Sequence, residues 1–425
     1  MKIKPVKGTR DFYPEVMRLR NYIIDAWKRV SLRNGFEEYD APIFEYLDLF
    51  TLKSGDEIAS QLFNFTDRGG RNLAIRPEMT PSLARMVAAK INALPRPVKW
   101  FSVPRLCRAE NPQKGRLREF FQWNIDIIGV DSIQADAECI YTAVDLLREL
   151  KLSAEDVCVR IGCRPLTVAA LEMGGIPADK MDSALALLDK KPKLSPEAFT
   201  KLTADVQLTA ENFAVADKLQ QAENIEQIQA IFADREDCAK PVEDLAELLG
   251  CVDQMGIADY CVLDMSIVRG LAYYTGVVYE VFDRKQSLRA VAGGGRYDKL
   301  LELVGGPSAT ATGFGMGDVV LAILLEEKGV LPENVSQGEL DYFVIDGRDT
   351  PFAKVLQTTG ALREKGFRAD YSFKRAAVGK QFKEASRRGA KFAVTIHGEI
   401  AAVKNLQTGE QLDDMPLADF LANLD

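Results

Sequence analysis

Histidine is almost absent from this chain of 425 residues, since His397 is the only one. A Ser-His-Asp triad needs a histidine as its general base, and a zinc site of histidine ligands needs several. Both kinds of site are therefore excluded. Because His397 lies between an expected strand and a turn, we assign it a structural role. Catalysis must then come from arginines, carboxylates, tyrosines and bound metal.

Long apolar runs and paired cysteines are missing as well. No stretch approaches the ~18 apolar residues that cross a membrane, and Met1–Pro5 does not open a signal segment. The seven cysteines are odd in number and form no C-x-x-C pair, which favours reduced thiols over a disulfide framework. The sequence therefore predicts a cytoplasmic protein with no membrane partner.

The usual phosphate-binding signatures are also lacking, although residues 293–298 and 313–318 are rich in glycine. Neither segment contains G-x-x-x-x-G-K-[ST], which excludes a P-loop, and neither has the G-x-G-x-x-G of a dinucleotide fold. Glycines within strands allow a ligand to approach the backbone closely. We therefore expect a nucleotide to bind across an antiparallel sheet.

Net positive charge is absent overall, but two segments are strongly basic. The chain carries a formal charge of −8, which opposes general nucleic-acid binding. Residues 99–118 nevertheless hold six Lys or Arg and one acid, and residues 363–391 hold ten Lys or Arg and three acids. This pattern predicts polyanion binding at two places. A pair of solvated helical faces is the alternative.

Periodicity predicts an α+β fold. The first part alternates a helix over 14–34, a strand over 37–43, a hairpin over 62–75, a helix over 81–93 and strands over 98–108 and 119–128. Such alternation is typical of an antiparallel sheet with helices on one face.

Further along, the pattern predicts three more parts. Residues 165–255 are nearly continuous helix and are predicted to be an insertion in a catalytic domain over 1–330. Residues 331–338 form a linker. A compact α/β unit with three strands and two helices follows over 339–425.

The most informative motif is Val268–Gly276, where Arg269 precedes a glycine and the paired tyrosines Tyr273 and Tyr274 follow. The glycine lets a ligand approach the arginine's backbone, and tyrosines line a pocket while their hydroxyls contact polar groups. An arginine tolerated at a strand edge is the alternative.

A second motif is Arg76–Thr80, in which Glu78 and Thr80 are two residues apart. At a strand end both side chains point to one side, where they can receive an ammonium group. An acidic first turn of a helix with a Thr cap is an equally physical alternative.

The third motif extends from Phe101 to Gly129. Arg108 and Arg116 flank a basic loop at a hairpin, an arrangement that suits a triphosphate, and Phe120 can stack on a base. Gln122, Asn124 and Asp126 share one face of the following strand. Because buried polar groups need partners, a ligand is expected on that face.

Together these blocks resemble the histidyl-tRNA synthetases, a family of class II aminoacyl-tRNA synthetases. The matching blocks are Gly8–Phe12, Arg76–Thr80, Arg108–Phe120, Val268–Gly276, Gly294–Asp298, Lys380–Ala385 and Asn405–Gln411. The resemblance implies a class II antiparallel sheet flanked by helices, with a helical insertion and a C-terminal α/β anticodon-binding domain. It implies a ligase that joins histidine to tRNA-His through a histidyl-adenylate made from ATP.

The resemblance also implies roles for individual residues. Those that would bind histidine are Glu78, Met79, Thr80, Gln122, Asp126, Tyr273 and Tyr274. Those that would hold ATP are Arg108, Glu110, Arg116, Phe120 and Arg296, with Arg108 and Arg269 acting in catalysis. Glu110 is a candidate Mg²⁺ ligand, and the tRNA-binding residues would be Gln113, Lys114, Arg375 and Lys380. A homodimer is implied, with the Pro42 strand and the helix before it at the interface.

Four positions depart from the family's pattern. Ala272 stands where an aspartate is common, Asp126 replaces glutamate, and Asn111 replaces an arginine of the basic loop. Val320 stands where an arginine usually holds the γ-phosphate, which suggests that Arg289 or Arg296 substitutes for it.

Two alternatives to this function remain within the same fold. One is a regulatory subunit of ATP phosphoribosyltransferase, a non-catalytic relative that typically lacks the anticodon-binding domain. The other is a synthetase for proline or threonine, which lacks the Val268–Gly276 block.

Overall fold

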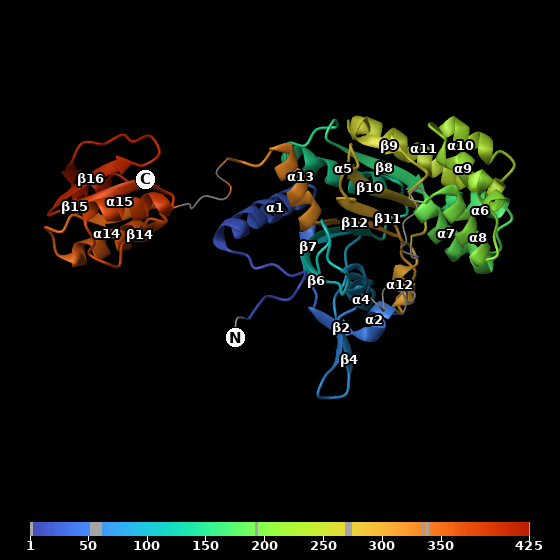
Figure 1. Ribbon diagram of the computed structural model, residues 1–425, viewed down its shortest axis with the longest axis horizontal. Helices are drawn as coiled ribbons and strands as arrows, with labels where there is room; N and C mark the ends of the chain where they lie inside the picture. The colour runs from blue at the N-terminus through green and yellow to red at the C-terminus, as the bar shows by residue number, and fades with distance from the viewer. Residues whose placement is uncertain are drawn as a thin grey trace. The chain divides into compact units, whose positions relative to one another are not determined.

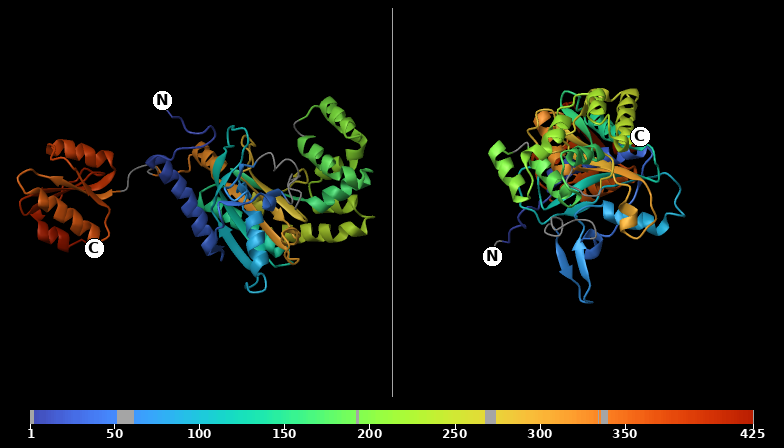
Figure 2. Two further views of the ribbon diagram at one scale, coloured as in Figure 1. Left: turned by 90° about the horizontal axis from the view of Figure 1, so that it is seen from below. Right: turned by 90° about the vertical axis from the view of Figure 1, so that its right-hand side faces the viewer.

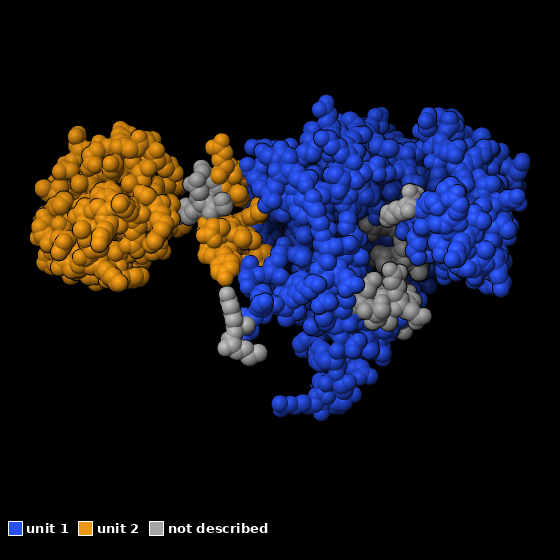
Figure 3. Space-filling model, viewed as in Figure 1, with its two compact units in different colours: residues 1–11, 20–331 blue, residues 12–19, 332–425 orange. Residues whose placement is uncertain are grey.

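The computed structural model describes residues 3–51, 62–191, 194–267, 274–333, 335 and 340–424. The chain divides into two compact units, coloured separately in Figure 3. One comprises residues 1–11 and 20–331, and the other comprises residues 12–19 and 332–425. Within the described parts of the chain, no helix has both the length and the apolar character needed to span a bilayer.

A nine-stranded sheet forms the centre of the first unit (Figure 1). Its order is β1-β5-β7-β12-β11-β10-β8-β9, and β6 pairs with β7 outside this path. The bounds are β1 Glu37–Glu38, β5 Val98–Ser102, β6 Arg105–Cys107, β7 Glu119–Ile128, β8 Val157–Cys163, β9 Cys261–Leu263, β10 Val277–Asp283, β11 Ala292–Arg296 and β12 Ala311–Gly317. The central pairs are antiparallel, as the sequence predicts, whereas β1/β5 and β8/β9 are parallel.

Helices cover both faces of this sheet. Helix α1 (Pro14–Arg33) places Trp27 6.3 Å from Trp123 of β7, and Trp123 Nε1 donates to Ser31 Oγ of the same helix. Helix α5 (Gln134–Glu149) lies on this side too, since its Asp136 accepts a hydrogen bond from Thr312 of β12. On the opposite side, α4 (Thr80–Lys90) and α12 (Leu300–Leu303) join an apolar cluster with Val98 and Ile128.

Prolines break two of the strands that the sequence predicts. The strand expected over 37–43 is limited to β1, and chain pairing resumes only at β2 (Phe44–Tyr46), beyond Pro42. The strand expected over 98–108 divides into β5 and β6 on either side of Val103-Pro104. Proline has no backbone N–H to donate to a neighbouring strand, which explains both corrections.

Two small elements complete the region around the sheet. The predicted hairpin forms as β3 (Asn64–Thr66) and β4 (Asn72–Ile75), which pair with β2 in a separate three-stranded sheet. Helices α2 (Leu47–Thr51) and α13 (Asp318–Lys328) follow β2 and β12, respectively.

Residues between β8 and β9 form a group of helices at one end of the sheet, green to yellow in Figure 2. The α-helices are α6 Arg164–Met173, α7 Met181–Lys190, α8 Pro196–Asp205, α9 Ala214–Gln220, α10 Ile225–Ile231 and α11 Ala239–Gln254. Short 3₁₀ turns lie among them at Ala178–Lys180, Ala210–Phe213, Glu236–Cys238 and Ala258–Tyr260. The insertion therefore interrupts the sheet between two strands that pair in parallel.

The C-terminal unit is built on a five-stranded sheet of order β14-β13-β15-β16-β17. Its elements are β13 Leu340–Asp346, α14 Phe352–Glu364, β14 Ala369–Tyr371, α15 Val378–Arg387, β15 Ala390–His397, β16 Ile400–Asn405, β17 Met415–Pro416 and α16 Leu417–Ala422. Strands β14, β13 and β15 are parallel, and β16 and β17 are added antiparallel. Tyr342 and Val344 pack in one apolar cluster with α14, while Phe343 and Ile345 pack in another with α15. The two helices therefore cover opposite faces.

Candidate active site

Two polar side chains of β7 lie over glycines of its neighbour β12. A Cβ atom built on Gly313 would lie 2.6 Å from Asp126 Oδ1, and one built on Gly315 would lie 2.7 Å from Gln122 Nε2. Such distances are too short for any real side chain at these two positions, so the glycines provide the space that Asp126 and Gln122 occupy. Gln122 and Asp126 therefore share one side of the sheet, as the two-residue period of a strand predicts.

Two tyrosines border the same space. Gly295 of β11 leaves room for the ring of Tyr274, whose Cδ1 lies 2.9 Å from where its Cβ would be. The hydroxyl of Tyr297 is hydrogen-bonded to Asp126 Oδ1. Both rings are buried and belong to the apolar cluster beneath α4. Tyr297 is a site residue that the sequence did not single out, although it directly follows the glycine-rich block.

The carboxyl group of Asp126 is the most unusual group of the site. It is 3% exposed, and its Oδ2 atom has no hydrogen-bond partner among the described residues. Burial raises the pKa of Asp126 to about 7, against the opposing effect of the Tyr297 hydrogen bond. A buried polar atom without a partner costs about 1–3 kcal/mol. A ligand N–H placed at Oδ2 would remove this cost.

The second motif closes β4 and begins α4. Arg76 fixes this corner, since its Nη1 donates to Asp40 Oδ1 at 2.7 Å and to the carbonyl of Ala41. Glu78 is buried, and Thr80 begins the helix. Met79 has a fully buried side chain, and its contact with the ligand stays a prediction.

The β6–β7 hairpin gathers the arginines expected to hold ATP. Arg108 Nε donates to the carbonyl of Pro77 at 3.0 Å, and its guanidinium lies 5.2 Å from the centre of the Phe120 ring. Arg116 forms an ion pair with Glu110, whose carbonyl accepts from Arg118 Nε. Arg108 therefore connects the second motif to the β6–β7 hairpin.

Arg289 joins this group from the β10–β11 connection. A Cβ atom on Gly115 would lie 4.0 Å from Arg289 Cδ and 3.3 Å from Val320 Cγ2, so both residues flank the same loop. Partial burial and then the charge of Arg116 lower the pKa of Arg289. Arg108 contributes in the same direction, while Glu110 and Glu280 oppose it. An anion would relieve the repulsion among these three arginines.

Arg296, the other suggested substitute for the arginine missing at 320, lies elsewhere. It forms an ion pair with Asp136 and donates to the carbonyl of Ser132 at 2.8 Å. Because side chains alternate along β11 and into Tyr297, Arg296 points to the α5 side while Gly295 and Tyr297 face Asp126. Arg296 therefore lies on the opposite face of the sheet from Asp126, and its contact with ATP stays a prediction.

The acidic groups suit a magnesium ion that is bound mainly by phosphate. Within the described residues, no cluster of three or more His, Cys, Asp or Glu side chains is arranged to hold a metal. Magnesium in phosphate-transfer sites needs only one or two carboxylates, with phosphate and water as its other ligands. Glu110, whose carboxylate pairs with Arg116, fits that requirement.

Residues expected to contact tRNA occupy two places. Gln113 and Lys114 lie in the turn of the hairpin, where Lys114 Nζ is 3.2 Å from Glu327 of α13. Lys380 is exposed in the first turn of α15. Arg375 is held by the buried carboxylate of Asp346, with Nε 2.6 Å from Oδ2.

Part of the most informative motif lies outside the described residues. Arg269, Ala272 and Tyr273 belong to that part. Beyond it, Thr275 Oγ1 donates to Asp298 Oδ2 at 2.9 Å.

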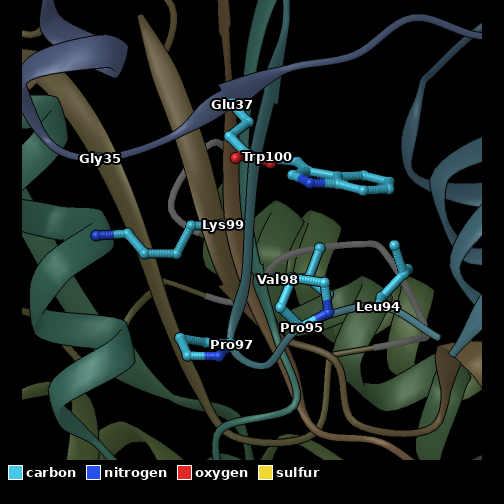
Figure 4. A pocket seen from close by; sticks show the side chains of 8 residues that line it. All are labelled: Gly35, Glu37, Leu94, Pro95, Pro97, Val98, Lys99 and Trp100. Carbon is cyan, nitrogen blue, oxygen red and sulfur yellow. The ribbon is translucent and has the colours of Figure 1, made fainter. Parts of the chain in front are cut away.

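A surface pocket of about 180 Å³ lies at the other edge of the sheet, next to β1 and β5 (Figure 4). Trp100 and Lys99 point to opposite sides of β5 there, and Gly35 and Glu37 complete the rim. Its lining includes none of the side chains named above for the site, although Trp100 is paired with Asp126 across β5 and β7.

Comparison with known proteins agrees with this geometry. The model of the family described as histidyl-tRNA synthetase matches residues 8–318, and that of an anticodon binding domain matches residues 344–425. A histidine–tRNA ligase of Opitutus terrae is 41% identical over 413 residues, which cover 94% of this chain and 91% of that protein.

Solved structures share the fold. A histidyl-tRNA synthetase from Nostoc sp. PCC 7120 superposes with a TM-score of 0.82 at 22% identity, covering 99% of this chain and 98% of the other. An ATP phosphoribosyltransferase regulatory subunit/histidyl-tRNA synthetase from Bacillus halodurans C superposes with a TM-score of 0.76 at 22% identity, covering 94% and 98%. The family match and the 41% identical relative together show that this chain belongs to the histidyl-tRNA synthetase family.

Proposed function

We propose that this chain is a histidine–tRNA ligase that activates histidine with ATP and transfers it to tRNA-His. Two observations carry the proposal: the buried Asp126 carboxyl has no hydrogen-bond partner at Oδ2 among the described residues, and Arg108, Arg116 and Arg289 lie close enough together for their charges to lower the pKa of Arg289. One end of the site suits an imidazole and the other suits a triphosphate.

At the histidine end, the imidazole N–H donates to Asp126 Oδ2 while Tyr297 holds Oδ1. Gln122 and Tyr274 border the same space, and Glu78 accepts the substrate's ammonium group. Because a donated N–H favours the charged form of a carboxyl group, histidine binding is expected to lower the raised pKa of Asp126.

At the ATP end, the substrate carboxylate attacks the α-phosphorus and pyrophosphate leaves. Arg108 holds the α-phosphate, Phe120 stacks on the adenine, and Arg116 with Arg289 holds the outer phosphates. Arg269, which lies outside the described residues, is assigned to the α-phosphate by the family resemblance alone. Positive groups fixed before the reaction stabilise the charge that develops on phosphate oxygens.

Magnesium, held by Glu110 and the phosphates, would neutralise charge on the β- and γ-phosphate oxygens. The same residue keeps Arg116 oriented through its ion pair. The pair therefore fixes Arg116 before ATP arrives.

We propose that a homodimer in the cytoplasm is the working form. Support for the dimer is the apolar surface of the segment around Pro42, where Ile43, Phe44 and Tyr46 are all exposed. Contiguous exposed apolar side chains are typical of an interface. Sedimentation equilibrium on the purified chain tests this point, because a monomer at micromolar concentration would refute it.

The regulatory-subunit alternative shares the fold, so the fold alone does not decide between the two. The anticodon binding domain over residues 344–425 favours the ligase, since a subunit that only regulates another enzyme has no use for it.

Charging of purified tRNA-His separates the two functions in one assay. We expect ATP-dependent attachment of histidine to tRNA-His, and histidine-dependent exchange of pyrophosphate into ATP. A chain that binds histidine but supports neither reaction would be a regulator. Exchange driven by proline or threonine instead of histidine would contradict the substrate assignment.

A further inference from the structure

The C-terminal unit has a topological switch point at the carboxyl edge of its parallel strands. The chain leaves β13 towards α14 on one face and leaves the adjacent β14 towards α15 on the other. The loops over residues 347–351 and 372–377 therefore follow the carboxyl ends of two neighbouring strands. Ligands of open α/β sheets bind outside the carboxyl ends of the strands.

An exposed aromatic ring stands at this point. Phe373 is 76% exposed, more than any other Phe, Tyr or Trp side chain in the described residues. Its ring is 5.1 Å from that of Tyr371 in an edge-on contact, and Tyr371 in turn lies 5.8 Å from Phe352. Tyr371 therefore supports one side of the Phe373 ring and leaves much of the rest to solvent.

A buried network fixes the two loops that surround this ring. Asp346 is 1% exposed and accepts from Arg375 Nε at 2.6 Å and from the Arg348 N–H at 2.8 Å. Arg375 Nη2 also donates to the carbonyl of Thr350 at 2.9 Å, so it joins the two loops. Gln381 Nε2 donates to the carbonyls of Asp346 and Ala376.

The segment that carries the ring is rich in cations and contains no carboxylate. Between Ser372 and Lys383 the sequence contains four Lys or Arg and no acid. Lys374 and Lys380 are exposed, and so is Arg348 in the adjoining loop. The buried carboxylate of Asp346 is engaged by Arg375, and Asp349 lies 3.1 Å from the ring nitrogen Nδ1 of His397.

An exposed aromatic ring among cations is the arrangement that binds single-stranded nucleic acid. Bases stack on the ring, and the cations follow the phosphates. An acidic peptide would use the cations but not the ring, and a lipid surface would need several exposed apolar side chains. The fixed loops also reduce the entropy lost on binding.

We propose that Phe373 is the stacking platform for an unpaired base of the tRNA anticodon loop, and that Arg375 positions it. This inference rests on the proposed function, because it assumes that tRNA is the nucleic acid. It assigns base contact to Phe373 and phosphate contact to Lys374 and Lys380. It also changes the expectation for Arg375 from a tRNA ligand to a residue that holds the two loops together.

The test compares Phe373→Ala and Phe373→Tyr with Leu356→Ala, a control at another exposed apolar residue of the same unit. We expect Phe373→Ala to lower kcat/KM for full-length tRNA-His by roughly 10-fold to 100-fold, the effect of losing one stacked base. Phe373→Tyr and Leu356→Ala should stay within about threefold of the parent, because a tyrosine ring also stacks.

Two substrates make the result specific. Histidine-dependent pyrophosphate exchange and charging of an acceptor-stem minihelix should be unchanged in Phe373→Ala, because neither involves the anticodon loop. A full-length tRNA charged equally well by Phe373→Ala and parent would overturn the proposal, as would an equal loss on the minihelix. If the parent supports no histidine-dependent exchange, the proposed function fails instead, so the two failures are distinguishable.

The positioning role of Arg375 has its own readout. Removal of a phosphate contact lowers the slope of log K against log salt by about one unit, whereas removal of a positioning residue leaves it unchanged. We expect Arg375→Ala to weaken tRNA binding without changing that slope, and to add little in a Phe373→Ala background. A lower slope, or full additivity, would show that Arg375 contacts phosphate directly.

Discussion

Two buried aspartates on opposite faces of the same sheet show the difference between a structural network and a binding site. Asp136, on the α5 side, is paired with Arg296 and accepts from Thr312. Asp126, on the other side, accepts from Tyr297 at one oxygen, and its other oxygen has no hydrogen-bond partner among the described residues. Burial raises the pKa of both carboxyl groups. The difference lies in their hydrogen-bond partners. Both carboxylate oxygens of Asp136 have one, whereas only one oxygen of Asp126 has one among the described residues.

The comparison teaches that burial alone does not identify a functional carboxylate. A buried charge that is fully paired contributes to the folded state and has no capacity left for a ligand. A buried carboxyl with an open oxygen destabilises the free protein and is satisfied when a ligand donates to it. The five predictions below test this contrast, in order of decreasing effect.

The largest effect is expected for Asp126→Asn. The change keeps the shape of the side chain but replaces an acceptor oxygen and its charge, so the dissociation constant for histidine should rise about 1000-fold, equivalent to ~4 kcal/mol. Isothermal titration of histidine measures it, with the exposed Asp131→Asn as the matched control. Affinity within threefold of the parent would remove Asp126 from the site.

The second largest effect is expected on the pH dependence of the free energy of unfolding. An unfolded aspartate titrates near 3.9 and folded Asp126 near 7, so between these values the folded state binds the extra proton. The contribution of Asp126 to the free energy of unfolding should therefore fall as pH rises from about 4 to about 7, by up to about 4 kcal/mol.

Asp126→Asn cannot titrate and should lose this component. In urea unfolding from pH 4.5 to 8, the free energy of unfolding of the variant minus that of the parent should increase as pH rises. The exposed Asp413→Asn is the control. Parallel curves for parent and Asp126→Asn would contradict the raised pKa.

For Asp136 we expect a change in the free energy of unfolding and little change in histidine affinity. Asp136→Ala leaves Arg296 buried without its partner, which should lower the free energy of unfolding by about 3 kcal/mol. Histidine affinity should change less than threefold in the protein that remains folded. Arg296→Met in the same background should recover part of the stability. A large loss of affinity with normal stability would mean that the two faces are not separate in function.

Arg289 tests the ATP end of the site. A hydrogen bond to a charged group contributes about 1.5–3 kcal/mol, so Arg289→Ala should raise the KM for ATP about 30-fold in pyrophosphate exchange. The KM for histidine should be unchanged. Lys285→Ala, an exposed residue of the same connection, is the control. An unchanged KM for ATP would leave the role of the missing arginine at 320 to another residue.

The smallest effect is expected for Tyr297→Phe. Removing one hydroxyl that orients Asp126 should weaken histidine binding about fivefold, a cost of ~1 kcal/mol for one hydrogen bond. Tyr260→Phe, which removes a hydroxyl bonded to the carbonyl of Leu152, controls for general loss of a buried hydrogen bond. If both changes affect histidine binding equally, Tyr297 has no special place in the site.

Much of the fold was predictable because alternation and helical period are local properties. The shared face of Gln122 and Asp126 follows directly from the strand period. The parallel edge pairs β1/β5 and β8/β9 were not predictable, since they join segments distant in the sequence. Pro42 and Pro104 are visible in the sequence, but how far each would interrupt its strand depends on the neighbouring chain.

The residue types of the candidate site could be named from the sequence. The hydrogen-bond and ion-pair partners of those residues could be named less well. Arg296 and Tyr297 are adjacent, and only the register of β11 against β12 decides which of them faces Asp126. Arg108 and Arg116 were named from one hairpin, whereas Arg289 was suggested only as one of two substitutes for the arginine missing at 320. The structure places Arg289 near both of them, on a separate connection. The pairing of Arg375 with Asp346 depends on tertiary contact between two loops, which no local pattern encodes.

Histidine-dependent exchange of labelled pyrophosphate into ATP tests the central claim most directly, in the parent and in Asp126→Asn. The account predicts exchange with histidine but not with proline or threonine in the parent, and its loss in Asp126→Asn at histidine concentrations that saturate the parent. Equal exchange in the two proteins, or exchange in the parent without histidine, would contradict the assignment of this site.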